Sequence, residues 1–424
     1  MQRRIQRTVT IAALVSVVTL TVGACGGSGF SDSGGAGGTG AGTDGELTSS
    51  KDGLTVLFAP SGDAETASVT SAVESWSKSS GVGTTVVPAT QLNQQLSQGF
   101  ASGKPADVFY LSSDALAGYA SNGSLLAYGD RLPNKDDFYP ALVKSFTYDG
   151  KFYCAPKDFS TLQLVINTDM WKAAGLTDAD VPTTWDQLKT VSQKLTRDGH
   201  VGLSVSGEYA RLGAFMVQAG GNLMNADSTE ATADSQANVQ ALQYVKGLLD
   251  GGELKYAKDL GAGWGGEAFG KGLAAMTIEG NWITGALSKD YPGVKYQVVE
   301  LPAGPAGKGS LQFSNCWGIA ADSPNQAAAL KLVEQLTSAD SQLAFSKAFG
   351  PMPSIGSAAE QWKTENPQLV PFLDAVDYAQ GVPTAKGSAD VVTDLNSKLE
   401  SLATGDPQQI LSQTQTNLQA LTGK

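Results

Sequence analysis

Histidine is almost absent from the sequence, which contains one, His200, among 424 residues. Metal centres with several histidine ligands are therefore excluded, and a catalytic triad has at most one candidate base. His200 follows residues 197–199 at a predicted helix end, so we expect it to be a surface residue in a turn. We expect no metal and no cofactor, and most histidine-dependent catalysis is excluded.

Clusters of basic residues are also lacking. The chain carries 29 Lys and Arg against 41 Asp and Glu, for a net charge of −12. Such a balance disfavours nucleic acid and anionic lipid as partners.

No apolar run is long enough to span a membrane, but a shorter one lies near the N-terminus. Arg3, Arg4 and Arg7 precede an apolar stretch over about residues 9–22, which ends in small residues before Cys25. This pattern predicts a secretory signal over residues 1–24. The Cys after the small residues resembles a bacterial lipoprotein signal, and this resemblance implies that Cys25 is lipidated, with palmitate among its acyl chains. The alternative is a plain signal peptide with an incidental Cys, and the choice between Sec and twin-arginine export stays open.

Residues 25–50 are rich in Gly, with Ser, Thr and Ala making up most of the rest. A segment of this composition cannot bury a core and is predicted to act as a flexible tether that reaches about 25 Å. The protein is then expected outside the cytoplasm, lipid-anchored to the outer face of the bacterial cell membrane.

Cysteine is otherwise scarce, since only Cys154 and Cys316 remain after lipidation. Exported proteins commonly join such a pair. Each Cys lies beside an aromatic residue at the start of an apolar strand, which favours a disulfide between neighbouring strands. Two separate buried thiols are the alternative.

From residue 54 onward the composition is that of an ordinary soluble protein of roughly 370 residues. A single hydrophobic core usually supports fewer residues than this, so two lobes are expected. Strands are predicted at 54–59, 84–87 and 106–111, with helices between them, so the first lobe is expected to hold a mostly parallel sheet. Ligands gather at the carboxyl ends of such strands, where residues 61–63 and 112–114 lie. Helix capping is the equally weighted alternative for these polar residues.

The segment 153–171 organises the rest of the chain. Its second half, 161–167, is an apolar, β-branched run typical of a buried strand. Its first half contains Pro156, Lys157 and Asp158, which suit a chain that crosses from one lobe to another. Locally an ordinary surface loop is the better interpretation, and the rest of the chain favours the crossing.

A sugar pocket is indicated at the end of the strand predicted over 272–278. Glu279, Asn281 and Trp282 follow it, and an indole can cover the apolar face of a pyranose while acids and amides take its hydroxyls. By itself, Trp282 would more often be a core residue.

Together, Asp107-Val108-Phe109, segments 153–171 and 275–282, and Trp317-Gly318-Ile319-Ala320 resemble the extracellular solute-binding proteins of ABC importers. They are most similar to the maltose-binding, or carbohydrate type 1, branch, and the similarity covers nearly the whole mature chain. The resemblance implies an α/β, two-lobed periplasmic-binding-protein fold of type II with three hinge crossings. Lobe 1 would comprise residues 51–157 plus 316–350, and lobe 2 residues 158–315 plus 351–424.

The resemblance also implies a ligand site without catalysis. The candidate ligand-binding residues are Asp63, Ser113, Asp114, Asp158, Phe159, Ser160, Glu208, Tyr209, Arg211, Glu279, Asn281 and Trp282. Two departures indicate fewer stacking platforms than in the maltose binder: Leu111 replaces an aromatic residue after the third strand, and no Trp lies near Asp390. A shorter or differently shaped sugar is therefore expected.

The function implied is that of a monomeric receptor that captures a mono- or oligosaccharide and delivers it to the membrane permease subunits of an ABC importer. A receptor for a polyamine or another small polar solute is the alternative within the same class, because several carboxylates could line one cleft. An exported glycoside hydrolase, using two of these carboxylates, is the alternative from the enzymes. A third alternative is a structural lipoprotein or adhesin. A protein of that class would not need polar residues that face one another between the lobes.

Overall fold

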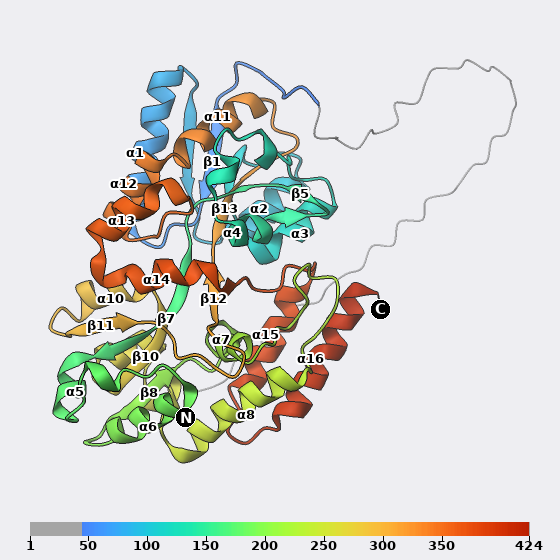
Figure 1. Ribbon diagram of the computed structural model, residues 1–424. Helices are drawn as coiled ribbons and strands as arrows, with labels where there is room; N and C mark the ends of the chain where they lie inside the picture. Colours follow the sequence, from blue (N-terminus) through green and yellow to red (C-terminus); the bar gives the residue numbers. More distant parts are fainter. Residues whose placement is uncertain (1–44, 424) are drawn as a thin grey trace, which may run out of the picture. The chain divides into compact units, whose positions relative to one another are not determined.

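The computed structural model of the protein describes residues 45–423 (Figure 1). The predicted signal peptide, the lipidation site at Cys25 and most of the predicted tether lie outside these residues. Within residues 45–423, none of the helices combines the length and the apolar character that a membrane crossing needs.

The first lobe is built on a five-stranded sheet. In spatial order its strands are β2 (Thr84–Pro88), β1 (Leu54–Phe58), β3 (Val108–Ser112), β13 (Asn315–Ile319) and β6 (Ala155–Pro156). β1 is parallel to both neighbours, as its βαβ connections require, whereas β13 is antiparallel to β3 and β6. A short hairpin of β4 (Thr147–Tyr148) and β5 (Lys151–Phe152) precedes the crossing.

The second lobe is built on a seven-stranded sheet. Its strands in order are β14 (Ala379–Gln380), β12 (Ser310–Phe313), β7 (Ser160–Asn167), β10 (Ala274–Gly280), β8 (Val201–Val205) and β9 (Leu254–Tyr256), with β11 (Tyr296–Val299) paired to β7. Every residue of β7 and β10 is buried. Because both faces of these strands are covered, apolar residues can occupy successive positions.

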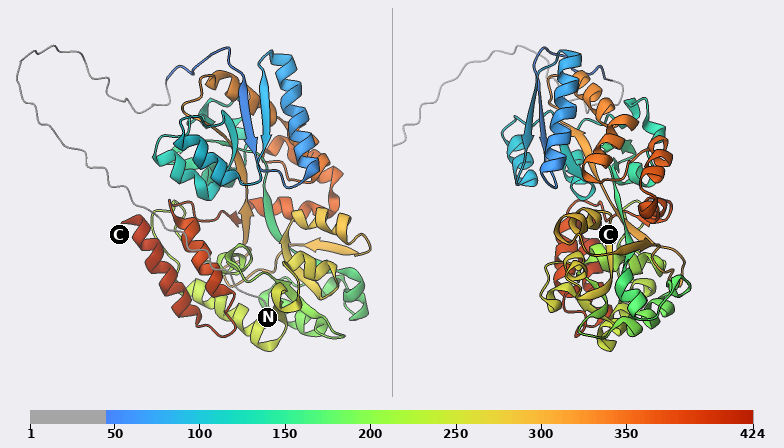
Figure 2. Two further views of the ribbon diagram at one scale, coloured as in Figure 1. Left: turned by 180° about the vertical axis from the view of Figure 1, so that it is seen from behind. Right: turned by 90° about the vertical axis from the view of Figure 1, so that its left-hand side faces the viewer.

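Helices cover both sheets (Figure 1). Those of the first lobe are α1 (Asp63–Ser80), α2 (Leu92–Ala101), α3 (Ser113–Ser121), α4 (Pro140–Ser145), α11 (Gln326–Leu336) and α12 (Ala339–Phe349). Those of the second are α5 (Thr168–Ala173), α6 (Trp185–Leu195), α7 (Tyr209–Gln218), α8 (Gln236–Gly251), α9 (Gly265–Gly270), α10 (Trp282–Asp290), α15 (Ser388–Leu399) and α16 (Pro407–Thr422). Figure 2 shows α15 and α16 side by side along the second lobe. Two short helices, α13 (Ala359–Glu365) and α14 (Val370–Asp374), follow the third crossing.

The chain passes between the two sheets three times, which confirms the predicted fold class. The first crossing joins β6 to β7, and the second joins β12 to β13 at Ser314. The third follows Gly350, which ends α12 in the left-handed conformation that glycine adopts without strain. There the backbone N–H of Phe159 donates to Met352 at 3.2 Å, so the first and third crossings are hydrogen-bonded to each other.

Each lobe has its own hydrophobic core, and a third cluster joins them. The third cluster includes Phe159 from the first crossing, Met352 from the third crossing, and Trp362 and Phe372 from α13 and α14. Ile355 still packs in the core of the first lobe, several residues beyond the predicted boundary at 350. The boundary between the lobes is therefore not a single residue here, because residues after the third crossing contact both the first-lobe core and the third cluster.

The predicted tether ends earlier than residue 50. Thr48 donates a hydrogen bond from its hydroxyl to the carbonyl of Ser323 at 2.7 Å, and its backbone N–H donates to Gln326 at 3.2 Å. Leu47 packs against the core of the first lobe. Residues 47–48 therefore belong to the folded part of the chain, which their composition alone did not indicate.

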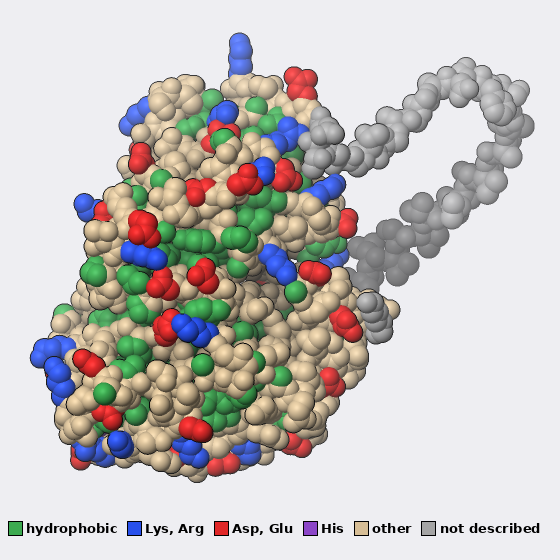
Figure 3. All heavy atoms as spheres, viewed as in Figure 1, with side chains coloured by type: hydrophobic (Ala, Val, Ile, Leu, Met, Phe, Trp, Pro, Cys, Tyr) green, Lys and Arg blue, Asp and Glu red, His purple; other side chains and the backbone are tan. Residues whose placement is uncertain are grey.

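Charged side chains of both signs are interspersed over the face of the molecule in Figure 3, without a block of basic residues. This distribution agrees with the acidic balance of the sequence. The face in this view therefore shows no basic stripe for a nucleic acid backbone.

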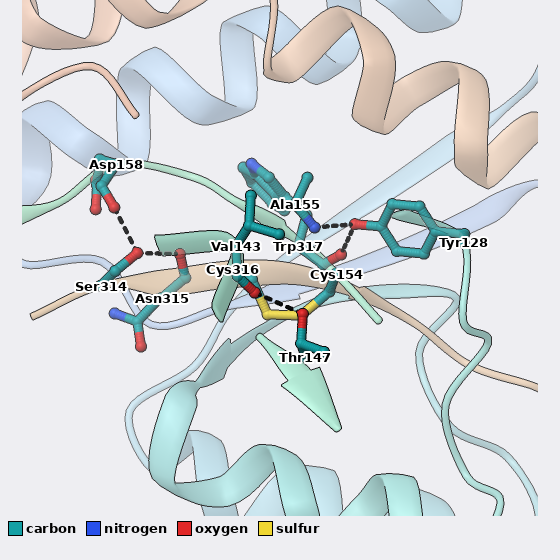
Figure 4. Close-up of a disulfide and its surroundings, with 10 residues drawn as sticks. All are labelled: Tyr128, Val143, Thr147, Cys154, Ala155, Asp158, Ser314, Asn315, Cys316 and Trp317. Carbon is teal, nitrogen blue, oxygen red and sulfur yellow. Dashed lines mark hydrogen bonds between the residues drawn. A yellow bond between two sulfur atoms is a disulfide. The ribbon is translucent and has the colours of Figure 1, made fainter. Parts of the chain in front are cut away.

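Cys154 and Cys316 form a disulfide beside the first crossing (Figure 4). Their Cα atoms are 5.6 Å apart, and both residues are buried. Cys316 lies in β13, which pairs with β6 directly after Cys154. The bond therefore links the residue before β6, where the first crossing leaves the first lobe, to β13, where the second crossing enters it, and the two cysteines are 162 residues apart.

Replacing both cysteines with serine is expected to lower the free energy of unfolding by up to about 5 kcal/mol, because a long loop regains its freedom in the unfolded chain. Urea denaturation of the two proteins measures this difference. The wild-type protein in reductant should unfold at the midpoint of the double variant. Equal midpoints for the oxidised wild type and the double variant would contradict the stabilising role.

Candidate functional site

A cleft of about 1320 Å³ lies between the two lobes. Its walls come from the carboxyl ends of β1 and β3, the first and second crossings, the start of α10 and the end of α12. Strand ends and helix starts meet here because parallel strands place their carboxyl ends at one edge of a sheet. The cleft therefore has the position that ligand sites take in such folds.

Two carboxylates stand on the first-lobe wall, at the starts of α1 and α3. Asp63 and Asp114 each lie in the first helical turn, where the positive end of the helix dipole favours negative charge. Neither helix has a side-chain cap: the cap positions are Gly62 and Ser112, and neither makes a capping hydrogen bond. The capping alternative considered for these polar residues is therefore not realised.

A buried charge cluster lies at the base of the cleft, where the chain first crosses. The ammonium of Lys157 lies 3.2 Å from Glu65 Oε1 and contacts the carboxylate of Asp158. Glu65 also accepts hydrogen bonds from the Tyr110 hydroxyl at 2.8 Å and from the backbone of Ser61 at 2.7 Å. The cluster links α1 to the first crossing, and we call these four residues, Glu65, Tyr110, Lys157 and Asp158, the crossing cluster.

Burial and charge act against each other in the crossing cluster. Burial raises the pKa of Glu65, but Lys157 and the hydrogen bonds from Ser61 and Tyr110 outweigh it, so the pKa lies below its usual value. Burial raises the pKa of Asp158, and the neighbouring ammonium does not fully offset it. Burial lowers the pKa of Lys157, but the two carboxylates outweigh this and leave the pKa raised. The lysine therefore stays charged, and its charge is compensated within the protein.

Trp282 forms an aromatic platform on the second-lobe wall. Its side chain is 38% exposed, and its indole N–H donates to Glu279 Oε2 at 3.0 Å. The guanidinium of Arg211 lies 5.1 Å from the ring centroid, and Phe313 meets the ring edge-on at 5.7 Å. The indole is thus held from several sides while part of it remains open to the cleft.

Glu279 holds the Trp282 indole and the Arg211 guanidinium in place through hydrogen bonds. It is fully buried, and its Oε2 accepts from Arg211 Nη2 at 2.6 Å as well as from Trp282. Burial raises the pKa of Glu279, against the opposing attraction of Arg211. A Cβ at Gly265 would lie 2.7 Å from Glu279 Oε1, so a larger residue there would force the Glu279 side chain to move.

The structure brings most of the predicted site residues to the cleft and separates four of them from it. Those that line the cleft are Asp63, Ser113, Asp114, Asp158, Phe159, Ser160, Asn281 and Trp282, while Glu208, Tyr209, Arg211 and Glu279 do not. Direct ligand contact by the second group is not supported in this arrangement. Arg211 and Glu279 instead contact Trp282, and Glu208 lies 3.3 Å from Arg211 in an ion pair.

Tyr209 and Phe159 are more buried than the sequence indicated. Tyr209 is 1% exposed, and its hydroxyl donates to Asn222 at 3.2 Å. Phe159 is 2% exposed and packs edge-on against Tyr139. Phe159 directly precedes β7 and Tyr209 begins α7, and each of these elements buries one face against apolar neighbours. The local sequence does not show which face is buried.

Several cleft residues were missed by sequence analysis, namely Glu65, Tyr296, Phe313 and Phe349. The aromatic side chains come from β11, the end of β12 and the end of α12, and no shared motif connects them. The only available signal was the position of Phe313 close to the predicted lobe boundary at residues 315 and 316. The number of aromatic groups in the cleft is therefore larger than the two sequence departures indicated.

A recess of about 410 Å³ adjoins the cleft, with which it shares Ala59, Ser112 and Asn315. We call it the α2 recess, because the start of α2 forms one wall. Its lining residues are Ala59, Gln91, Leu92, Asn93, Gln94, Tyr110, Ser112 and Asn315. None of them carries a charged side chain, in contrast to the cleft itself.

Asn281 connects the platform to the hinge. Its side-chain N–H donates to the carbonyl of Gly350 at 2.8 Å, and its backbone N–H donates to the hydroxyl of Ser160 at 3.2 Å. Ser160 begins β7 and Gly350 precedes the third crossing. Asn281, the residue directly before Trp282, is therefore hydrogen-bonded to the ends of two crossings. Its position therefore favours a role in orienting the platform.

The variant Asn281→Ala is expected to lower the free energy of unfolding by about 0.5–1.5 kcal/mol, because the hydrogen bond from the Asn281 side chain to the Gly350 carbonyl is lost. Urea denaturation measures the loss. Asn417→Ala serves as a matched control, since Asn417 makes an exposed hydrogen bond to Asp394 and its removal should change little. Equal effects of the two variants would show that the Asn281 contact is not stabilising.

Two α/β lobes, three crossings and an interlobe cleft with an aromatic platform define a two-lobed binding protein. A model of the bacterial extracellular solute-binding protein family matches residues 71–371, and the chain belongs to this family. The family and its structural neighbours are receptors, not enzymes, so the glycoside hydrolase alternative is not supported. The family resemblance inferred from sequence is confirmed.

Individual relatives are distant but span most of the chain. A putative binding protein of Brucella abortus (strain 2308) is 23% identical over 358 residues, which cover 80% of this chain and 85% of the relative. The GacH receptor of Streptomyces glaucescens, solved without ligand and with acarbose, is 26% identical with a TM-score of 0.75, covering 88% of this chain and 99% of that one. A cyclic α-maltosyl-1,6-maltose binding protein of Arthrobacter globiformis has a TM-score of 0.78 at 22% identity, with coverage of 88% and 99%.

Proposed function

We propose that the protein is the substrate-binding receptor of an ABC sugar importer. It captures a mono- or oligosaccharide in the interlobe cleft and delivers it to the membrane permease. The observation that carries this proposal is the platform of Trp282, which is open to the cleft on one side and ordered by Arg211 and Glu279 on the other. An exposed indole between polar groups suits a pyranose, which has an apolar face and a rim of hydroxyls.

Further support comes from the rest of the cleft and from the relatives. Carboxylates of Asp63 and Asp114 on the opposite wall can accept hydrogen bonds from sugar hydroxyls. The structures of GacH and of the Arthrobacter protein were determined for proteins that bind acarbose and a cyclic maltosyl-maltose. A saccharide is therefore the ligand class that the cleft and its relatives favour together.

Calorimetric titration of the mature chain with a broad panel of mono- and oligosaccharides tests the proposal. At least one saccharide should bind with measurable heat, and solution scattering should show compaction of the same sample as the lobes close. The absence of heat across the panel, together with unchanged scattering, would reject the proposal.

A cationic ligand such as a polyamine is a second candidate. Within residues 45–423, no ion pair is formed by either Asp63 or Asp114, so two carboxylates on the cleft wall remain available to a cation. Spermidine binding with an affinity that falls steeply with added salt would favour this candidate.

The location and assembly of the protein are also proposals. A lipid on Cys25 would hold the receptor on the outer face of the cell membrane beside its permease, and the protein would act as a monomer. The variant Cys25→Ser should move the protein from the membrane fraction to the medium, and analytical ultracentrifugation should give the mass of one chain. Retention of the variant in the membrane fraction would contradict lipid anchoring at this residue.

A further inference from the structure

A pocket of about 210 Å³ lies beside the cleft, between α4 of the first lobe and three segments of the second lobe. We call it the α4 pocket. Its second-lobe walls come from Gln312 of β12, the loop 222–228 and residues 379–384. Val382 lines both the α4 pocket and the cleft, so the two are neighbouring parts of one interlobe space.

Gln312 brings an unpartnered hydrogen-bond acceptor to this pocket. It is 3% exposed, and its Nε2 donates to the Ala141 carbonyl at 3.0 Å and to the Ser145 hydroxyl at 3.3 Å. Its Oε1 is buried and accepts no hydrogen bond from any residue within 45–423. The opposite orientation of the amide is excluded, because the Ala141 carbonyl can only accept and must face the nitrogen. The oxygen therefore needs a donor that the described residues do not supply.

The α4 pocket is larger than the donor alone requires. One ordered water would satisfy the Gln312 oxygen, and a water needs only about 10–15 Å³ of such space. The volume of the pocket is about 210 Å³. It therefore has room for a larger polar group that also reaches this oxygen.

The lining favours a hydroxyl group over a charged one. Among the described residues of the lining only Lys144 is charged, and its ammonium lies 3.7 Å from the carboxylate of Asp227. Asn222 also lines the pocket. Its Oδ1 accepts from the Tyr209 hydroxyl and from the Leu223 backbone N–H, while its Nδ2 donates to no other residue in the described part of the chain. An unpaired acceptor and an unpaired donor together match a hydroxyl, whereas an ammonium only donates and a carboxylate only accepts.

We propose that the α4 pocket is a subsite for the terminal unit of a neutral oligosaccharide whose other units occupy the cleft. A hydroxyl of this unit donates to Gln312 Oε1, and an oxygen of the same unit accepts from Asn222 Nδ2. Because α4 belongs to the first lobe and both amides to the second, the bound unit contacts both lobes.

This inference rests on the proposed function and narrows its ligand to an oligosaccharide. Trp282 lines the cleft but not the α4 pocket. A single sugar unit would therefore have to leave the platform to enter the pocket, whereas a longer ligand occupies both.

The dependence of affinity on ligand length tests the inference. The probes are malto-, cello-, xylo- and manno-oligosaccharides of one to five units, titrated calorimetrically into the mature wild-type chain. In a series that binds, one added unit should raise the affinity by about fivefold or more, because it gains the hydrogen bonds of the pocket. We define the length step as the affinity of that ligand divided by the affinity of the ligand one unit shorter.

The variant Ala226→Trp tests whether the length step comes from the α4 pocket. Ala226 is exposed and lines the pocket, so an indole there should occupy the space without entering a core. The length step should fall to within about twofold, while the shorter ligand binds as it does to the wild type. Ala420→Trp is the matched control, because Ala420 is exposed on α16 and does not line the pocket. The length step compares two ligands on one variant, so a general effect on lobe closure cancels.

A second variant removes the unpartnered oxygen without adding bulk. Gln312→Met keeps a side chain of similar length and lacks the acceptor, so the length step should fall here as well. The variant also loses the hydrogen bonds to α4, and its urea midpoint is therefore measured beside its affinities. If it does not fold, Ala226→Trp decides the question.

Three results would overturn the inference. The first is an affinity that does not rise with length in any series, and the second is a length step that Ala226→Trp leaves unchanged. The third is a panel in which other saccharides bind but none of the four oligosaccharide series does. Each of these results leaves the proposed receptor function intact, because a saccharide still binds. Failure of every saccharide would instead reject the receptor function itself.

Discussion

Trp282→Ala is expected to weaken saccharide binding by about 30-fold or more, which corresponds to about 2 kcal/mol, the usual threshold for an aromatic residue that dominates an interface. The indole is the large aromatic group that the structure both exposes to the cleft and orders through neighbours. Its removal leaves Arg211 still paired with Glu279, so the variant should keep its fold. Calorimetric titration with the saccharide identified from the panel measures the loss.

Two further variants show whether the effect comes from the ring. Trp282→Phe keeps an aromatic face but loses the hydrogen bond to Glu279, so its affinity should lie between those of the wild type and the alanine variant. Leu421→Ala removes the other large hydrophobic side chain that is exposed within the described residues, and its affinity should equal that of the wild type. An alanine variant at position 282 that binds as tightly as the wild type would remove the main support for the sugar receptor.

Lys157→Met should lower the free energy of unfolding by about 3–5 kcal/mol, because the carboxylates of Glu65 and Asp158 would remain buried without their cation. Methionine has a similar length, so the change removes the charge without leaving a large void. Urea denaturation near neutral pH measures the loss. Lys135→Met is the matched control: Lys135 pairs with the adjacent Asp136 at 2.6 Å on the surface, and its removal should have little effect.

The pH dependence of the Lys157→Met variant has a definite sign. Without the ammonium, burial raises the pKa of both carboxyl groups above their unfolded values, so the folded state binds more protons than the unfolded state. The deficit in stability is then full above the folded pKa and shrinks as the pH falls towards about 4. The triple variant Glu65→Gln, Lys157→Met, Asp158→Asn should recover much of the lost stability near neutral pH. A deficit that stays constant with pH would show that lost packing, rather than unpaired charge, is the cause.

Local patterns in the sequence predicted the fold because the relevant signals are short in range. The apolar run of β7 predicted a buried strand, whereas Pro156, Lys157 and Asp158 before it fit a surface loop as well as a crossing, and the rest of the chain decided for the crossing. The alternation of strands and helices before it requires parallel neighbours in the first sheet, as β1, β2 and β3 show. Burial and hydrogen bonding within a few residues decide such features.

The candidate site was predicted less completely, because its contacts join residues that are far apart in sequence. Glu65 looks like an acidic residue in the first turn of an exposed helix, yet it contacts Lys157, 92 residues away. Glu279 looks like a ligand at a strand end, yet it is buried beneath Trp282 and bonded to Arg211, 68 residues away. Neither role has a local pattern, because the residue types are the same whether a carboxylate faces a ligand or supports its neighbour.

The sequence by itself determined the class of the protein: two α/β lobes, a chain that crosses between them, and an indole at a strand end. Each of these features has a signal in residues that are close together along the chain, and the resemblance to solute-binding proteins implied how they combine into one fold. Only the tertiary structure decided which side chains face the cleft, that the charge of Lys157 is compensated within the protein, and that the carboxamides of α2 adjoin the cleft. These outcomes depend on how separate strand ends and helix starts meet in space, which no single segment specifies.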